Sequence, residues 1–165
     1  MMRSISISRG VRIAAVLAVA IFAAACSQNP ALDPTNPLAT AATPGSAQDF
    51  IVNVGDRVFF ESDSTELSQQ SRDTLEKQAR WLTLYNRYSF TVEGHADERG
   101  TREYNIALGA RRAQAVREYL VARGIDGARM RTISYGKERP VAVCNDISCW
   151  SQNRRSVTVL NQAGA

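Results

Sequence analysis

The sequence predicts an α+β domain of two layers, in which a mixed four-stranded sheet carries two helices on one face. Two observations predict this fold. Residues 50–165 contain four short segments with the composition of strands, and two longer segments in which buried-type side chains recur every three or four positions. Their order along the chain is β-α-β-α-β-β, and no internal repeat is apparent.

The first strand and the first helix come early in this domain. "DRVFFES", residues 56–62, is rich in Val and Phe and predicts a strand. "SQQSRDTLEKQARWLTLYN", residues 68–86, predicts an amphipathic helix that Ser68 is suited to cap. One stripe of this helix is expected to face the core, and it consists of Ser71, Leu75, Gln78, Ala79, Leu82 and Tyr85.

The composition and periodicity of the later residues predict three more strands and a second helix. "YSFTVEGH", residues 88–95, predicts a strand with Phe90 and Val92 on one face. "NIALGARRAQAVREYLVARG", residues 105–124, predicts a helix that Gly124 is placed to end. Its buried stripe consists of Ile106, Gly109, Ala113, Val116 and Leu120. Two more strands are expected at residues 129–136, "RMRTISYG", and 154–160, "RRSVTVL", with a long loop between them.

Residues 1–25 are expected to form an export signal. A basic start, "MMRSISISRGVR", precedes the uncharged run "IAAVLAVAIFAAA", which falls short of the ~20 residues that span a bilayer. A short membrane anchor is the alternative. "AAAC", ending at Cys26, resembles a bacterial lipobox, whose cysteine becomes a lipidated N-terminus, although Ala23 stands where leucine is usual. By analogy, Ser27 after that cysteine directs a lipoprotein to the outer membrane, and several acyl chains on one residue give stable anchoring.

The positive charge of the chain lies mostly in this leader. Arg3, Arg9 and Arg12 precede Cys26 and no acidic residue does, so the rest of the chain carries 17 basic against 16 acidic side chains. A domain with a net charge of +1 lacks the basic footprint that binds nucleic acid.

Residues 26–49 are expected to form the lipidated cysteine and a flexible tether. The segment holds four of the five prolines of the chain and no aromatic residue, so it cannot bury enough apolar surface to offset its ordering entropy. Fully extended, it would reach at most roughly 80 Å. The tether would let a lipid-anchored domain work away from the membrane.

The other two cysteines are Cys144 and Cys149, in "VCNDISCW". Export places them in an oxidising compartment, where a short disulfide is favoured, with two free thiols as the alternative. No second Cys/His pair completes a zinc site, so we expect no metal and no cofactor.

His95 is the only histidine of the chain and ends the second predicted strand. A catalytic role would need a nucleophile or further metal ligands, and no G-x-S-x-G motif or second histidine is present. We therefore expect His95 to be a scaffold residue, hydrogen-bonded to a loop carbonyl or carboxylate, and the protein not to be an enzyme.

Asp97 and Arg112 form the second candidate site. Asp97 follows the strand on a β–α loop, where functional groups gather. Asn105, Leu108 and Arg112 stand at i, i+3 and i+7 and share one stripe of the next helix. Arg112 could bind a carboxylate and Asp97 an ammonium, so the pair would suit a zwitterion. From spacing alone, a simple ion pair between Asp97 and Arg112, or a solvated Arg112, is equally supported.

"TVEGHADERGTREYNIALGARRAQAVREYL" strongly resembles the OmpA-like peptidoglycan-binding domain family, whose signature is a strand ending in G-H-x-D and a helix with N-x-x-L-x-x-x-R. The resemblance covers roughly residues 56–160, and the leader narrows it to lipid-anchored members. It implies the OmpA-like two-layer fold. It also implies that Asp97 and Arg112 line a pocket for the meso-diaminopimelate of the peptidoglycan stem peptide.

The resemblance extends to further residues. Asn105 and Leu108 match the family's motif, and Asp63 matches an aspartate after the first strand, although Ser62 stands where many relatives have an aromatic residue. Gly109 replaces a serine common in relatives and is expected to affect packing alone. Glu98 and Arg99 either rim the pocket or belong to an exposed loop.

The resemblance also implies a biological setting. The chain would be an outer-membrane lipoprotein facing the periplasm, would bind peptidoglycan, and would act with the Tol system, TolB in particular, in envelope integrity and cell division. Its membrane contact would be the acylated Cys26. The alternatives are an interaction module that works mainly through TolB and, less favoured, a cell-wall hydrolase.

Overall fold

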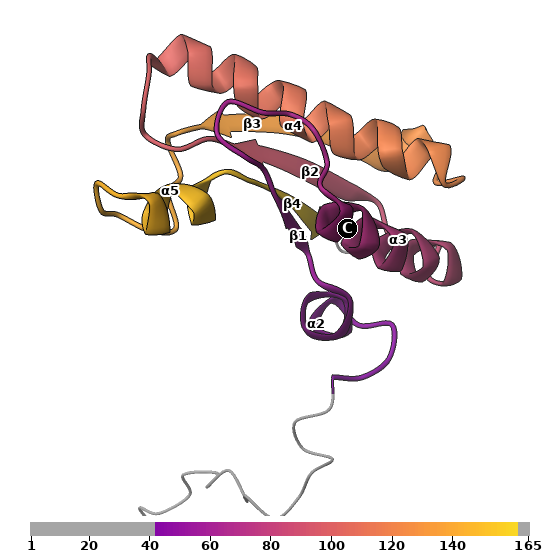
Figure 1. Ribbon diagram of the computed structural model, residues 1–165. Helices are drawn as coiled ribbons and strands as arrows, with labels where there is room; N and C mark the ends of the chain where they lie inside the picture. Colours follow the sequence, from indigo (N-terminus) through magenta and orange to yellow (C-terminus); the bar gives the residue numbers. More distant parts are fainter. Residues whose placement is uncertain (1–41, 162–165) are drawn as a thin grey trace, which may run out of the picture. The chain divides into compact units, whose positions relative to one another are not determined.

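The computed structural model describes residues 42–161, so the predicted signal peptide, Cys26 and most of the tether lie outside the described residues. Within them, four strands form one sheet in the order β1-β4-β2-β3 (Figure 1). The strands are β1 (Arg57–Phe59), β2 (Phe90–His95), β3 (Met130–Gly136) and β4 (Arg155–Leu160). Strands β2 and β3 are parallel, and β4 is antiparallel to both of its neighbours, so the sheet is mixed as predicted.

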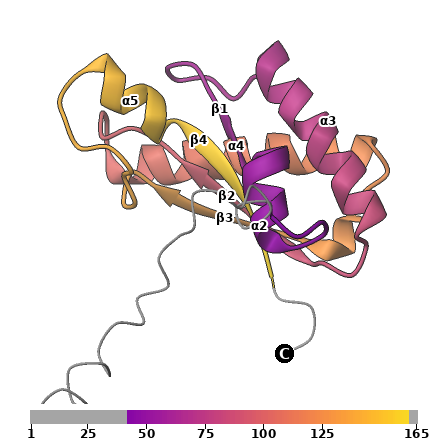
Figure 2. The same ribbon diagram turned by 90° about the horizontal axis from the view of Figure 1, so that it is seen from below.

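Four α-helices of residues 42–161 accompany the sheet, and they are α2 (Ala47–Asp49), α3 (Gln69–Leu84), α4 (Arg102–Ala122) and α5 (Ile147–Asn153). A π-helical turn, Phe50–Val54, continues α2, and a 3₁₀ turn, Gly127–Arg129, precedes β3. Helices α2 and α5 lie at opposite ends of the sheet (Figure 2). None of the helices in residues 42–161 has the length and apolar character needed to cross a bilayer.

The two long helices cover the same face of the sheet. Gly94 of β2 lies against the backbone of Gly109 in α4, and Gln78 of α3 accepts a hydrogen bond from the Thr158 hydroxyl of β4 at 2.9 Å. Gly94 and Thr158 share a face because Gly94 pairs with Ser156, two residues from Thr158. The main core lies between these layers, and it includes Val58, Phe90 and Val92 of the strands and Leu75, Leu82, Ala113, Val116 and Leu120 of the helices.

Capping side chains set the helix starts. Ser68 accepts from the backbone N–H of Ser71, as the sequence predicted for α3. Thr101 caps α4 in the same way, through the N–H of Tyr104, so α4 begins at Arg102 and not at Asn105. Asn105 therefore lies in the first turn of α4 and not at its start.

Helix α5 occupies part of the segment that was predicted to be a long loop. Asp146 caps it by accepting from the N–H of Ser148, and a disulfide joins Cys144, just before the helix, to Cys149 within it, with Cα atoms 5.6 Å apart. The prediction missed this helix because its seven residues are too few to show a helical period.

The domain begins before residue 50. The carbonyl of Gly45 accepts from the Tyr88 hydroxyl at 2.8 Å, and Oδ2 of Asp49 accepts from Nε1 of Trp81 at 2.8 Å. These contacts attach residues 45–49, which were expected to end the tether, to the C-terminal half of α3 and the start of β2.

Candidate functional site

A cleft of about 280 Å³ opens where β2 ends and α4 begins. The five residues that the sequence singled out come together in its wall, and they are Asp63, Asp97, Asn105, Leu108 and Arg112. Strand β2 delivers Asp97 two residues after its last position, and α4 delivers the last three residues from successive turns of one stripe. A larger groove of about 430 Å³ lies along β1 and α3, and none of the five residues lines it.

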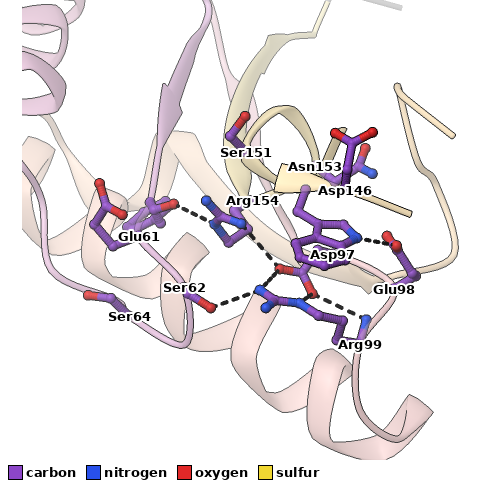
Figure 3. Close-up of polar contacts among 12 residues, drawn as sticks. Glu61, Ser62, Ser64, Asp97, Glu98, Arg99, Asp146, Ser151, Asn153 and Arg154 are labelled. Carbon is purple, nitrogen blue, oxygen red and sulfur yellow. Dashed lines mark hydrogen bonds and ion pairs between the residues drawn. The ribbon is translucent and has the colours of Figure 1, made fainter. Parts of the chain in front are cut away.

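Asp97 is buried, with 7% of its surface exposed, and its carboxylate is held by two arginines (Figure 3). Arg99 donates from Nη2 to Oδ2 at 2.7 Å and from Nε to Oδ1 at 3.1 Å. Arg154 donates from Nη1 to Oδ2 at 3.4 Å. Burial alone would raise the pKa of Asp97, but the hydrogen bonds from Arg99 and Arg154 outweigh it and lower the pKa. Asp97 is therefore an anion at neutral pH.

Arg112 is fully buried and holds the loop after β1 to the end of β2. Its guanidinium donates from Nε to the carbonyl of Ser64 at 2.9 Å, from Nη1 to that of His95 at 2.8 Å and from Nη2 to that of Glu61 at 3.0 Å. Burial, with the positive charge of Arg154, lowers the pKa of Arg112 to about 10, so it stays charged.

No hydrogen bond or ion pair of residues 42–161 joins Arg112 to Asp97, so the simple pairing that spacing left open does not occur there. A guanidinium has five N–H groups, and three carbonyls use three of them. Arg112 thus combines a fixed position with a positive charge at the wall of the cleft.

Asn105 and Leu108 shape the cleft in different ways. Asn105 is buried and donates from Nδ2 to the carbonyl of Arg99 at 2.7 Å, which pins the loop after Asp97. Leu108 is 5% exposed and adds an apolar surface to the wall. Asn105 therefore supports the charged groups through the backbone of their loop.

Asp63 lines the cleft from the loop after β1. Its φ of 54° is left-handed, a conformation that Asp tolerates better than most residues. Its Oδ1 accepts a hydrogen bond from the Tyr104 hydroxyl of α4. This hydrogen bond is the main cause that raises the pKa of Tyr104.

Four further residues line the cleft, and they are Ser62, Arg99, Gly100 and Tyr104. Arg99, which the sequence left as either rim or exposed loop, belongs to the rim. Its Nη2 also donates to the Ser62 hydroxyl at 2.8 Å, and its guanidinium lies 4.2 Å from the centre of the Trp150 ring. Ser62 is thus an acceptor for Arg99. Tyr104 was missed, since an exposed tyrosine near a helix start gives no signal in the sequence.

His95 contributes to the site only through its backbone. Its carbonyl accepts from Arg112, whereas its ring is 2% exposed and lies 5.6 Å, between centroids, from the ring of Tyr135. The expected ring hydrogen bond is missing from the described contacts: neither ring nitrogen has a partner, and Oε2 of Glu93 lies 3.6 Å from Nε2. Burial, together with the charges of Arg155 and Arg139, lowers the pKa of His95 to about 4.

The chemistry of the cleft is that of binding. His95 has no hydroxyl or thiol partner to activate, and no group of three or more potential metal ligands occurs in residues 42–161. What the cleft offers is one buried carboxylate, two arginines and an apolar side chain around an open volume. Such a site can recognise a small ligand that carries charges of both signs.

Comparisons with known proteins agree with this architecture. The model of the OmpA family matches residues 59–154. The chain is 70% identical over 127 residues to the peptidoglycan-associated lipoprotein of Rhizobium meliloti (strain 1021), covering 77% of this chain and 72% of that protein. It is 59% identical over 155 residues to the protein of the same name from Mesorhizobium japonicum, covering 94% of this chain and 92% of that protein.

A solved structure is similar as well. The crystal structure of the peptidoglycan-associated lipoprotein from Burkholderia pseudomallei matches with a TM-score of 0.63 and 37% identity, covering 81% of this chain and all of that one. None of these names is that of an enzyme.

Proposed function

Because this chain belongs to the OmpA family, we propose that it is an outer-membrane lipoprotein that binds peptidoglycan non-covalently and ties the outer membrane to the cell wall. The names of its relatives support this proposal, and so does the absence of a nucleophile–base pair at the cleft of the described domain. The predicted lipidation of Cys26 and the tether would supply the membrane end of the link.

The proposed ligand is the diaminopimelate residue of the stem peptide. Its side chain ends in a carbon that bears both an ammonium and a carboxylate, so it presents two opposite charges close together. The observation that carries the proposal is the placement of the Asp97 carboxylate and the Arg112 guanidinium in the wall of one open cleft. The ammonium would approach Asp97, and the carboxylate would approach the Arg112 guanidinium, which keeps two N–H groups beyond the three that bind the carbonyls of Glu61, Ser64 and His95.

Arg99 gives this site a second cation. The guanidinium of Arg99 covers both oxygens of Asp97, and 44% of the Arg99 side chain is exposed. A ligand ammonium would share Asp97 with Arg99 or displace it, and the displaced guanidinium would then be free to contact the ligand carboxylate. Both arrangements keep the buried carboxylate paired, which a buried charge requires.

Binding to whole sacculi tests the proposal. The full chain, solubilised in detergent, is incubated with purified sacculi and sedimented. Asp97→Asn should lower the affinity at least about thirtyfold, since removing one partner of a buried charge pair costs 2 kcal/mol or more. Asp73→Asn, a change on the exposed side of α3, is the matched control. Wild-type retention of the Asp97→Asn protein, with its fold verified by circular dichroism, would reject the site.

A role with TolB and the Tol system, and through it in cell division, can coexist with peptidoglycan binding. The family resemblance supports it, and we include it in the proposal. A competition assay between TolB and a soluble stem peptide discriminates the possibilities: displacement indicates a shared surface, and a ternary complex indicates separate ones. If TolB binds while sacculi do not, the interaction module is the better description.

A further inference from the structure

A second hollow of about 350 Å³ lies beside the cleft, on the other side of the loop that carries Asp97. Side chains of consecutive residues in this loop alternate: Asp97 and Arg99 line the cleft, and Ala96 and Glu98 line the second hollow. Figure 3 shows the Arg99 guanidinium pointing toward Ser62 and the Glu98 side chain pointing to the side on which Asn153 lies. The cleft and the second hollow are therefore separated by the width of this loop, beside which the Trp150 ring lies.

The second hollow has small apolar walls. Ala96 comes from the loop, and Pro140, Ala142 and Val143 come from the segment between β3 and α5. These are short side chains, so the space between them suits a methyl group better than a long or aromatic side chain.

The hollow is built rigidly although it lies at the surface. Asn153, only 1% exposed, accepts from the backbone N–H groups of Val141 at 2.9 Å and Ala142 at 3.2 Å and donates to the carbonyl of Ala142 at 2.8 Å. The disulfide between Cys144 and Cys149 joins the end of this wall to α5. A preformed hollow costs little ordering entropy when a ligand enters it.

One cation faces this hollow. Lys137 donates from Nζ to the carbonyls of Glu98 at 3.1 Å and Gly100 at 2.7 Å, which uses two of its three N–H groups. The third is left for a ligand anion. The carboxylate of Glu98 is held at the rim by a hydrogen bond from Nε1 of Trp150.

We propose that this second hollow binds the D-alanine that follows diaminopimelate in the stem peptide, with its methyl group against Ala96, Ala142 and Val143 and its terminal carboxylate on Lys137. The inference rests on the proposed function, because the position of the D-alanine follows from diaminopimelate in the cleft. D-alanine is joined to the main-chain carboxyl of diaminopimelate, at the opposite end of that residue from the two charges held in the cleft. It therefore lies outside the cleft, on a chain in which each extended residue spans roughly 3.5 Å, and it can pass over the rim to the second hollow. The site would thereby distinguish stem peptides by their length.

Calorimetry with defined stem peptides tests this inference on the full chain. The tripeptide ends in diaminopimelate, the tetrapeptide adds one D-alanine, and a third ligand is the tetrapeptide with its terminal carboxylate amidated. The tetrapeptide should bind about tenfold more tightly than the tripeptide, since a methyl group in an apolar pocket and a paired carboxylate both contribute. Amidation should remove part of this gain.

Ala142→Phe fills the hollow and should abolish the gain while leaving the tripeptide affinity unchanged. Ala122→Phe, at the exposed far end of α4, is the matched control and should retain the gain. Nuclear magnetic resonance of the wild-type chain gives a second readout that needs no variant: the methyl signals of Ala142 and Val143 should shift with the tetrapeptide and not with the tripeptide.

The outcomes separate the two proposals. Equal affinities for tripeptide and tetrapeptide, or methyl signals that do not respond, overturn the D-alanine site and leave diaminopimelate binding in place. A gain that persists in Ala142→Phe also overturns it. Failure of the wild-type chain to bind the tripeptide at all overturns the proposed function and the D-alanine site with it.

Discussion

The guanidinium of Arg99 binds both carboxylate oxygens of Asp97, with Nη2 to Oδ2 at 2.7 Å and Nε to Oδ1 at 3.1 Å. Spacing alone left open an ion pair between Asp97 and Arg112, a solvated Arg112 or a shared ligand site. The structure assigns the two arginines different tasks: Arg99 neutralises Asp97 from the exposed side, and Arg112 joins the loop after β1 to the end of β2.

Arg99→Lys should raise the pKa of Asp97 toward its ordinary value. Lysine cannot form the two-point contact that Arg99 makes with Asp97. The hydrogen bonds that lower the pKa of Asp97 would therefore weaken, while burial would still raise it. Titration of the Asp97 carboxyl carbon by nuclear magnetic resonance measures the change. Arg57→Lys, which alters the exposed partner of Asp56, should leave Asp97 as it is. An unchanged pKa of Asp97 in the Arg99→Lys protein would contradict the assignment.

Arg112→Met should destabilise the domain by about 3–5 kcal/mol, because it leaves buried carbonyl groups without a donor and removes the link between the loop after β1 and the end of β2. Chemical denaturation measures the loss. Arg111→Met is the matched control: the neighbouring side chain is exposed, so its loss should change the free energy of unfolding by less than about 0.5 kcal/mol. Similar losses in both variants would show that Arg112 has no special structural role.

His95 should make stability depend on pH between about 6.5 and 4. Its pKa is about 4 in the folded chain and 6.5 in the unfolded one, so the unfolded chain binds more protons in this window. The free energy of unfolding therefore falls as the pH falls, by at most about 3 kcal/mol from this group. Carboxylates titrate in the same range, and His95→Phe isolates the contribution of the histidine. The wild type should lose more stability than the variant on acidification, and parallel curves would contradict the prediction.

Gly94→Ala should be among the most damaging small changes in the sheet. A Cβ at Gly94 would lie 1.8 Å from the carbonyl oxygen of Gly109, so α4 would have to move away from β2. We expect a loss of about 3 kcal/mol in the free energy of unfolding. At Gly127 an added Cβ meets mainly the flexible end of Arg117, so Gly127→Ala should cost less. Equal losses in the two variants would be inconsistent with a close helix–sheet contact.

Sequence reasoning found those parts of the site that depend on local spacing. Asn105, Leu108 and Arg112 share a stripe because of the helical period, and Asp97 follows a strand that could be recognised from its composition. These residues line one cleft because α4, which carries three of them, packs directly on β2, which Asp97 follows.

Tertiary contacts decided what the sequence could not show. Arg99 stacks on Trp150, a residue 51 positions later in a helix too short to be predicted. Two of the carbonyls that Arg112 binds, those of Glu61 and Ser64, belong to the irregular loop after β1, whose course no periodic pattern describes. Ser62 gave no hint of its hydrogen bond to Arg99, since a serine in a loop is compatible with many partners.

The position of β2 bears on how the domain would withstand tension. Residues 45–49 attach beside the start of β2, through Gly45 and Tyr88, and the cleft opens two residues beyond its end. A pull between a membrane anchor and the cell wall would run lengthwise along β2, whose neighbours on both sides, β3 and β4, hold it by hydrogen bonds across the pulling direction. Under such a pull, the hydrogen bonds on both sides of β2 would have to break at the same time and not one after another. A strand of six residues could therefore transmit force while it stays paired in the sheet.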